Sequence, residues 1–170
     1  MVDSLDTMYI MGLHDEFERG VRMAENMTFT ASDVRVTVFI YNAFKMELIS
    51  QQHLFAPFFE TVIRYLGGLL SAYALSNDVT LLHRADELGA ALLPAFDTPS
   101  GFPAYSVNPK TGKSAGGWSG MSNGWLAEIG SCQMEYKYLA KITGKKKYYE
   151  VVRKLQIISW FMELMSYRCM

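Results

Sequence analysis

The chain has 170 residues, half of them apolar, which is enough for one domain with a sizeable core. It carries 16 basic and 17 acidic residues, and the formal net charge of −1 excludes the basic excess typical of proteins that bind nucleic acid or anionic membranes. The two cysteines, Cys132 and Cys169, are too few for a disulfide framework or a cysteine-rich metal site.

The beginning of the chain carries no recognisable targeting signal. Residues 1–10, MVDSLDTMYI, are acidic and contain neither an apolar core nor a small-residue cleavage site. The uncharged apolar stretch of residues 65–77 is too short to cross a bilayer as a helix. These features alone predict a soluble chain without a membrane span.

Three helices are predicted in the first half of the chain. Apolar residues recur at helical spacing through residues 4–27, which predicts one helix there. A second helix is expected over residues 57–76. Asn77 can close it, and Asp78 can cap a third helix over residues 79–93.

A long loop is predicted over residues 94–124, which contain four of the five prolines. A loop of that length inside a compact domain is usually functional or disordered. Its aromatic residues favour a functional loop, and they are Phe96, Phe102, Tyr105 and Trp118.

Helices are expected again after this loop. One covers residues 124–144, where Gly144 provides a stop, and another begins at residue 145. Only residues 34–41, VRVTVFIY, have the composition of a strand, and no set of strands accompanies them. The predicted fold class is therefore all-α.

The pair Glu60 and Arg64 is the first candidate for chemistry, because residues four apart lie on one face of a helix. Residues 66–75 follow without a charge and are rich in small side chains, so other elements can approach this helix closely. A surface ion pair worth roughly a few tenths of a kcal/mol explains the spacing equally well. In the functional alternative Glu60 is a catalytic carboxylate, and Arg64 orients it or binds substrate.

Other candidates rest on weaker patterns. Glu128 and Glu135 are two helical turns apart, and their apolar neighbours argue against an ordinary solvent-facing surface. Asp3 lies near the start of a helix, where acids are favoured on electrostatic grounds alone. Asn26 begins an N-glycosylation pattern, Asn-Met-Thr, which has meaning only in the secretory pathway.

Four motifs occur in order along the chain: VDSLDTMYIMGL, FFETVIRYLGGLLSAY, LLPAFDTPSGFP and LAEIGSCQMEYKYLAKITG. Together they resemble the class I α-1,2-mannosidases of glycoside hydrolase family 47, especially the fungal enzymes that trim N-linked glycans. The resemblance covers residues 2–33 and residues from 57 to about 152. Because the four motifs are in register, the resemblance is highly specific.

The resemblance implies an (α/α)7 barrel, a ring of helical hairpins with the active site in its axial cavity and a calcium ion at the bottom. It also implies hydrolysis of terminal α-1,2-linked mannose with inversion, which needs two carboxyl groups far enough apart to admit a water. By the match of motifs, Glu60 takes the position of the proposed general acid, and Arg64 that of a substrate-binding arginine. Asp3 and Glu128 match acidic positions of the site.

The chain also departs from the family pattern. Residues 34–56 interrupt the pattern, and residues 153–170 no longer resemble it. The family's other catalytic acids and its calcium-binding threonine come from motifs that the chain does not contain. We therefore expect an incomplete barrel with only the first two to three hairpins, inactive by itself, from a defective gene model or a truncated reading frame.

The expected ligands are high-mannose N-glycans or mannose oligosaccharides, with calcium as the cofactor implied by the family. The family also implies the secretory pathway, either the endoplasmic reticulum, the Golgi or the cell exterior. An alternative function is that of a non-catalytic relative that binds glycans in glycoprotein degradation. A third possibility is a fragment that does not fold stably alone, because a partial ring exposes broad apolar faces.

Overall fold

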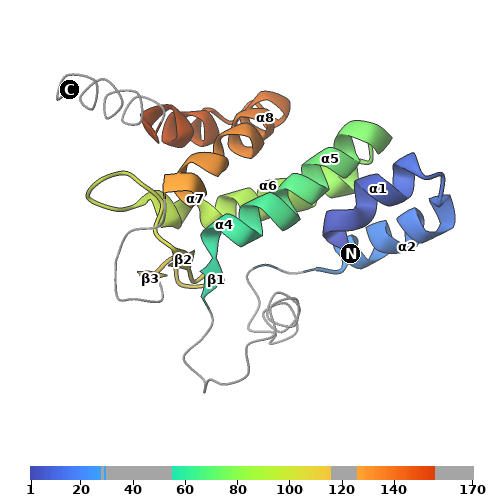
Figure 1. Ribbon diagram of the computed structural model, residues 1–170, viewed down its shortest axis with the longest axis horizontal. Coiled ribbons are helices and arrows are strands. Elements are labelled where there is room, and N and C mark those ends of the chain that lie inside the picture. The colour runs from blue at the N-terminus through green and yellow to red at the C-terminus, as the bar shows by residue number, and fades with distance from the viewer. Residues whose placement is uncertain (28, 30–54, 116–125, 156–170) are drawn as a thin grey trace, which may run out of the picture.

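A computed structural model describes residues 1–27, 29, 55–115 and 126–155, and these are mainly helical (Figure 1). The predicted all-α class is confirmed. The helices are α1 Leu5–Ile10, α2 His14–Glu25, α4 Phe58–Thr61, α5 Gly67–Ser76, α6 Val79–Leu92, α7 Leu126–Ser131 and α8 Gln133–Thr143, and residues 146–155 are also helical. Within these ranges, no helix has the length and apolar character needed to span a bilayer.

The first predicted helix is broken in two. Val2–Ser4 forms a 3-10 turn that continues into α1, and the chain then turns before α2. Gly12 in this turn has a φ of 73°, in the left-handed region that glycine adopts most easily. The prediction of a single helix over residues 4–27 is therefore wrong, because the apolar periodicity continues through the turn.

One helical rod carries the candidate pair. α4 runs into a π turn, Val62–Leu66, and then into α5, so most of the predicted second helix is present. Asn77 ends the rod with a φ of 57°. The Asp78 side chain accepts a hydrogen bond from the Thr80 N–H (2.8 Å) and caps α6, as its position predicts. α6 then runs back alongside α5 (Figure 1).

The core lies where α4, α5, α6 and α8 meet. The Phe58 ring packs against Phe96 and Tyr136, with centroid distances of 5.1 and 6.4 Å. The buried Tyr136 hydroxyl donates a hydrogen bond to the Gly89 carbonyl (3.1 Å), which ties α8 to α6. Phe96 is therefore a core residue, and its predicted place among the aromatics of a functional loop is wrong.

The N-terminal segment lies along α5. A Cβ added to Gly68 would lie 2.8 Å from the Val2 carbonyl oxygen and 3.2 Å from the Asp3 Cα. Further along, the Ser71 hydroxyl donates a hydrogen bond to Asp6 Oδ2 (2.8 Å). Because the two segments advance in the same direction between these contacts, α1 runs parallel to α5. The small residues of α5 thus admit a neighbouring backbone, as the sequence predicts.

A small antiparallel sheet lies at the start of α4 (Figure 1). Ala56–Pro57 (β1) pairs with Ser106–Val107 (β2), which in turn pairs with Ser114–Ala115 (β3). The prediction that residues 94–124 form an irregular loop without strands is therefore wrong for the described part. Strands of two residues are too short to show an alternating pattern in the sequence.

Some predictions fall on residues outside the described ranges. These include the strand-like segment 34–41, most of the expected insert 34–56, the loop residues 116–124 and most of the expected tail 153–170.

Candidate functional site

Arg64 contacts two carboxylates that are far apart in the sequence. Its Nε donates a hydrogen bond to Glu60 Oε2 (2.6 Å), and its Nη1 lies 3.6 Å from Asp3 Oδ2. Glu60 belongs to α4, Arg64 to the π turn, and Asp3 to the N-terminal 3-10 turn. The structure thus brings together three of the four residues predicted for the site.

Two local features of the backbone bring Glu60, Arg64 and Asp3 together. The π turn ends where the Gly67 N–H donates to the Val62 carbonyl, five residues earlier, and such turns are frequent at functional sites. Gly68 lets the N-terminal turn approach until Asp3 reaches Arg64. The predicted sharing of one helix face by Glu60 and Arg64 is confirmed by their hydrogen bond.

The group is open to solvent and carries an excess of acceptor oxygens. The hydrogen bond and the charge of Glu60, with a smaller contribution from Asp3, raise the pKa of Arg64. The side chains of Glu60, Arg64 and Asp3 are 27%, 42% and 53% exposed. Ion pairs at such positions contribute only about 0–1 kcal/mol to stability. Two acids held by one base are therefore better suited to accept hydrogen bonds from a hydroxyl-rich ligand than to stabilise the fold.

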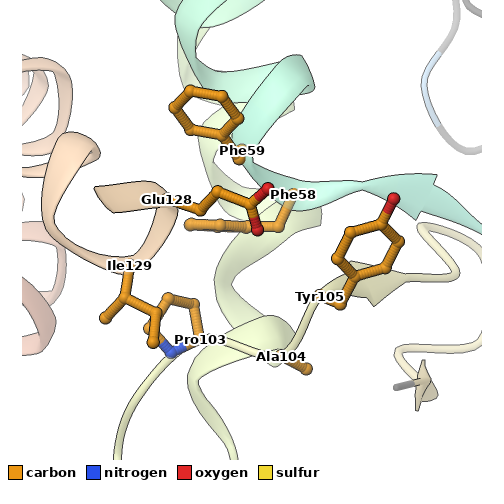
Figure 2. Close-up of a pocket in the computed structure, with 7 residues that line it drawn as sticks. All are labelled: Phe58, Phe59, Pro103, Ala104, Tyr105, Glu128 and Ile129. Atoms are coloured by element: carbon orange, nitrogen blue, oxygen red, sulfur yellow. The ribbon is translucent and has the colours of Figure 1, made fainter. Parts of the chain in front are cut away.

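Glu128 lies in a hollow at the start of α4 (Figure 2). Its carboxylate lies over the Phe58 ring, between Phe59 and Tyr105. Pro103, Ala104 and Ile129 complete the lining. Glu60 follows Phe59 directly in α4 but is not one of the lining residues. The fourth predicted site residue, Glu128, therefore lies outside the Arg64 group, in a hollow lined by the neighbour of Glu60.

Backbone hydrogen bonds hold the wall of the hollow. The Phe58 N–H donates to the Tyr105 carbonyl (2.8 Å), and the Ala104 N–H donates to the Ala95 carbonyl (2.8 Å). Sequence reasoning recognised Tyr105 only as one aromatic of a long loop and did not single out Phe59. The pairing of the Tyr105 strand with the start of α4 brings the two rings to one place, and no sequence pattern reports that pairing.

Glu135 is a half-buried acid that the sequence did not distinguish from Glu128. The chain turns at Cys132, so the two acids lie on different helices, and the predicted single helix over residues 124–144 is interrupted. A Cβ added to Gly67 would lie 3.7 Å from Glu135 Oε1, so the carboxyl packs against the start of α5. Its Oε2 is buried without a hydrogen-bond partner among the described residues, and burial raises the pKa of Glu135.

The described residues do not fit a calcium ion. Nowhere in these parts of the chain do three acidic, histidine or cysteine side chains come together as a ligand set. Asp3 and Glu60 both contact the Arg64 guanidinium, which would repel a cation. We therefore assign no calcium ligand among these residues.

Asn26, the predicted glycosylation site, is exposed at the end of α2. Its Nδ2 donates a hydrogen bond to the Arg22 carbonyl (2.7 Å). Modification of Asn26 stays a prediction.

Known proteins match the chain over nearly its whole length. A family model described as Glycosyl hydrolase family 47 matches residues 1–166. The chain is 39% identical over 158 residues to mannosyl-oligosaccharide alpha-1,2-mannosidase IA of Spodoptera frugiperda, an alignment that covers 92% of this chain and 20% of that protein.

Two human proteins show similar agreement. Mannosyl-oligosaccharide 1,2-alpha-mannosidase IB is 40% identical over 159 residues, covering 92% of this chain and 21% of that protein. The endoplasmic reticulum mannosyl-oligosaccharide 1,2-alpha-mannosidase is 38% identical over 156 residues, covering 91% and 19%. The chain spans about a fifth of the length of these relatives.

Proposed function

The chain belongs to glycosyl hydrolase family 47, and from this premise we propose that it forms part of an enzyme that hydrolyses terminal α-1,2-linked mannose of N-linked glycans with inversion. The names of the relatives, mannosyl-oligosaccharide 1,2-alpha-mannosidases, support this substrate. The observation that carries the proposal is the contact of Arg64 with both Glu60 and Asp3, because it joins two separate motifs into one exposed acidic group.

In this proposal Glu60 is the general acid that protonates the leaving glycosidic oxygen. Arg64 holds its Oε2 at 2.6 Å as a hydrogen-bond acceptor. The proton for the leaving group is therefore carried by the other oxygen, Oε1.

Asp3, Arg64 and Glu128 bind the sugar hydroxyls around this acid. Both carboxylates accept hydrogen bonds from hydroxyl groups, and Arg64 holds Asp3 and Glu60 in a fixed relation. Inversion requires a second carboxyl group to activate a water on the opposite face of the sugar. We assign that group to none of the residues that the structure describes.

We propose that residues 1–170 are part of an (α/α)7 barrel, with residues 34–56 and 153–170 departing from the family pattern, and that the chain alone is inactive. Calcium is bound by ligands that are not among the described residues. The name of one relative, an endoplasmic reticulum enzyme, supports a place in the secretory pathway.

A chimaera with a longer relative tests the function of these residues even though the 170-residue chain is expected to be inactive by itself. The 158 residues aligned with the Spodoptera relative replace the matching segment of that protein, and mannose release from α-1,2-mannobiose is measured with calcium present. We expect activity in the chimaera and a loss of about 100-fold or more in kcat for Glu60→Gln, since general acids contribute roughly 10²–10⁴-fold. Glu18→Gln, at an exposed residue of α2, is the matched control.

The outcomes separate the two functional classes. Activity that survives Glu60→Gln would refute the assignment of the general acid. A folded chimaera that binds high-mannose glycan without calcium and releases no mannose would favour the non-catalytic alternative. Mannose release by the 170-residue chain itself would refute the proposal that it is inactive alone.

A further inference from the structure

We propose that the solvent-exposed face of α2 binds the solvent-exposed face of the helix at residues 146–155 in a second copy of this chain. The two faces differ, so the contact joins unlike surfaces, head to tail. The inference is independent of the proposed function, because neither face contains a residue of the Arg64 group or of the Glu128 hollow.

Both helices pack one face against the rest of the molecule and leave the other face in solvent. The buried residues are Phe17, Gly20 and Ala24 in α2, and Tyr148, Val152 and Leu155 in the other helix. The Tyr148 hydroxyl donates a hydrogen bond to Asp86 Oδ1 of α6 (2.7 Å), which fixes the inward side of residues 146–155. Figure 1 shows α2 (blue) and residues 146–155 (red) well apart, so the two exposed faces do not meet within one molecule.

The two exposed faces carry opposite charges. The face of α2 has four acids and two bases, which are Asp15, Glu16, Glu18, Glu25, Arg19 and Arg22. The face of residues 146–155 has four bases and one acid, which are Lys146, Lys147, Arg153, Lys154 and Glu150. Both arginines of α2 already pair with Glu16 and Glu18 in the same helix, and neither Asp15 nor Glu25 has an ion pair among the described residues. Complementary charge of this kind guides association and sets the orientation of the partners.

Each face also presents one large apolar side chain. Met23 of α2 is 44% exposed, and Tyr149 is 47% exposed. Met23 follows Glu16 by two helical turns, and Tyr149 lies three residues after Lys146, so each apolar side chain lies among the charges of its own face. A methionine side chain packs favourably against an aromatic ring. The pair would form an apolar centre with a charged rim, which is the usual arrangement of a protein interface.

A contact between unlike faces determines the kind of assembly. Each dimer still has one free α2 face and one free face at residues 146–155, so further copies can add until a ring closes. One pair of helix faces is a small interface, which predicts weak and reversible association. Its strength depends on exposed charges, so salt should weaken it.

Sedimentation velocity of the 170-residue chain tests this association. At about 10 mM salt we expect the average mass to rise with protein concentration beyond that of a dimer. At about 0.5 M salt the association constant should fall at least about 10-fold, because the Debye length shrinks from roughly 30 Å to less than about 8 Å. A chain that stays monomeric at low salt, or that associates equally at both salt concentrations, would overturn the inference.

Charge reversal tests which faces meet. The first variant combines Asp15→Lys with Glu25→Lys, and the second combines Lys146→Glu with Lys154→Glu. Each variant alone should be monomeric at low salt, because its two faces then carry charge of the same sign. An equimolar mixture should associate again, since each face now finds an opposite charge on the other variant. A mixture that stays monomeric, or single variants that associate as the wild type does, would refute the pairing of these two faces.

The matched control combines Lys110→Glu with Lys113→Glu, at two exposed lysines outside both faces. It changes the net charge by the same amount as the second variant and should associate within about twofold of wild type. An equal loss in this control would show that net charge, and not the pairing of two faces, governs the association. Circular dichroism checks that all variants keep their helices.

Discussion

Gly68 of α5 and Val2 of the N-terminal turn are in direct backbone contact. A Cβ placed on Gly68 would lie 2.8 Å from the Val2 carbonyl oxygen, closer than real Cβ atoms approach. The obstacle is backbone, which cannot rotate away as a side chain does. This contact fixes where Asp3 lies along α5, and thereby the 3.6 Å distance between Asp3 Oδ2 and Arg64 Nη1.

Gly68→Ala should destabilise the protein by about 1–3 kcal/mol, because the N-terminal turn has to move away from α5. Urea unfolding followed by circular dichroism measures the change. Gly130→Ala is the control, since nothing lies within 4 Å of a Cβ at that helical position. It should be neutral or stabilising by up to about 1 kcal/mol. Equal effects of the two substitutions would contradict the close packing.

Arg64→Lys should separate function from stability. Lysine keeps the charge but cannot contact two carboxylates through a planar fork. We expect the chimaera to lose about 10-fold or more in kcat, while its free energy of unfolding changes by less than about 1 kcal/mol, because both partners of the ion pair are partly exposed to solvent. Arg22→Lys, in the exposed i, i+4 pair with Glu18, should change neither quantity. A loss of stability as large as the loss of activity would argue for a structural role.

Glu135→Gln should stabilise the protein at neutral pH. Burial raises the pKa of Glu135 in the folded state, so its favourable contribution is complete only below the unfolded value of about 4.3 and is lost as pH rises through the folded value. Glutamine avoids that loss, and a gain of roughly 1 kcal/mol is expected at neutral pH.

The gain should shrink toward zero as the pH is lowered below about 4, where wild-type Glu135 is protonated in both states. Urea unfolding over a pH series checks this dependence. Glu150→Gln, at an exposed position, serves as the control and should show no such trend. A stabilisation that is independent of pH would show that charge burial is not the cause.

Cys132 should resist alkylation in the native protein. It is 1% exposed, and burial together with the nearby Glu135 raises the pKa of its thiol to about 12. Little thiolate is therefore present at mildly alkaline pH. Iodoacetamide labelling followed by peptide mass analysis should find Cys132 modified in concentrated urea and unmodified without it. Fast native labelling would mean that the contact between α7 and α8 opens readily.

The sequence and the structure agree where information is local. The α6 helix was predicted from its periodicity and from the cap at Asp78, and the Glu60–Arg64 contact from a spacing of four residues. Disagreement begins where the backbone turns without breaking the apolar pattern, at Gly12 and at Cys132. The meeting of Tyr105 with α4 depends on strands of two residues, which leave no pattern to read.

The candidate site shows the same contrast between local sequence patterns and contacts of distant segments. Resemblance to a family suggested Asp3, but only the packing of the N-terminal turn against Gly68 explains why it reaches Arg64. The environment of Glu135 was not predicted, because it depends on the contact between α8 and the start of α5. Such contacts join distant segments, and spacing along one helix does not report them.

The parallel packing of α1 on α5 has a consequence for biosynthesis. The hydrogen bond from Ser71 to Asp6 spans 65 positions, so α1 is made long before its partner emerges from the ribosome. At about 5–20 residues per second this interval lasts several seconds. Throughout it the apolar side of α1 is accessible to chaperones, and a pause in translation ahead of α5 would prolong that exposure.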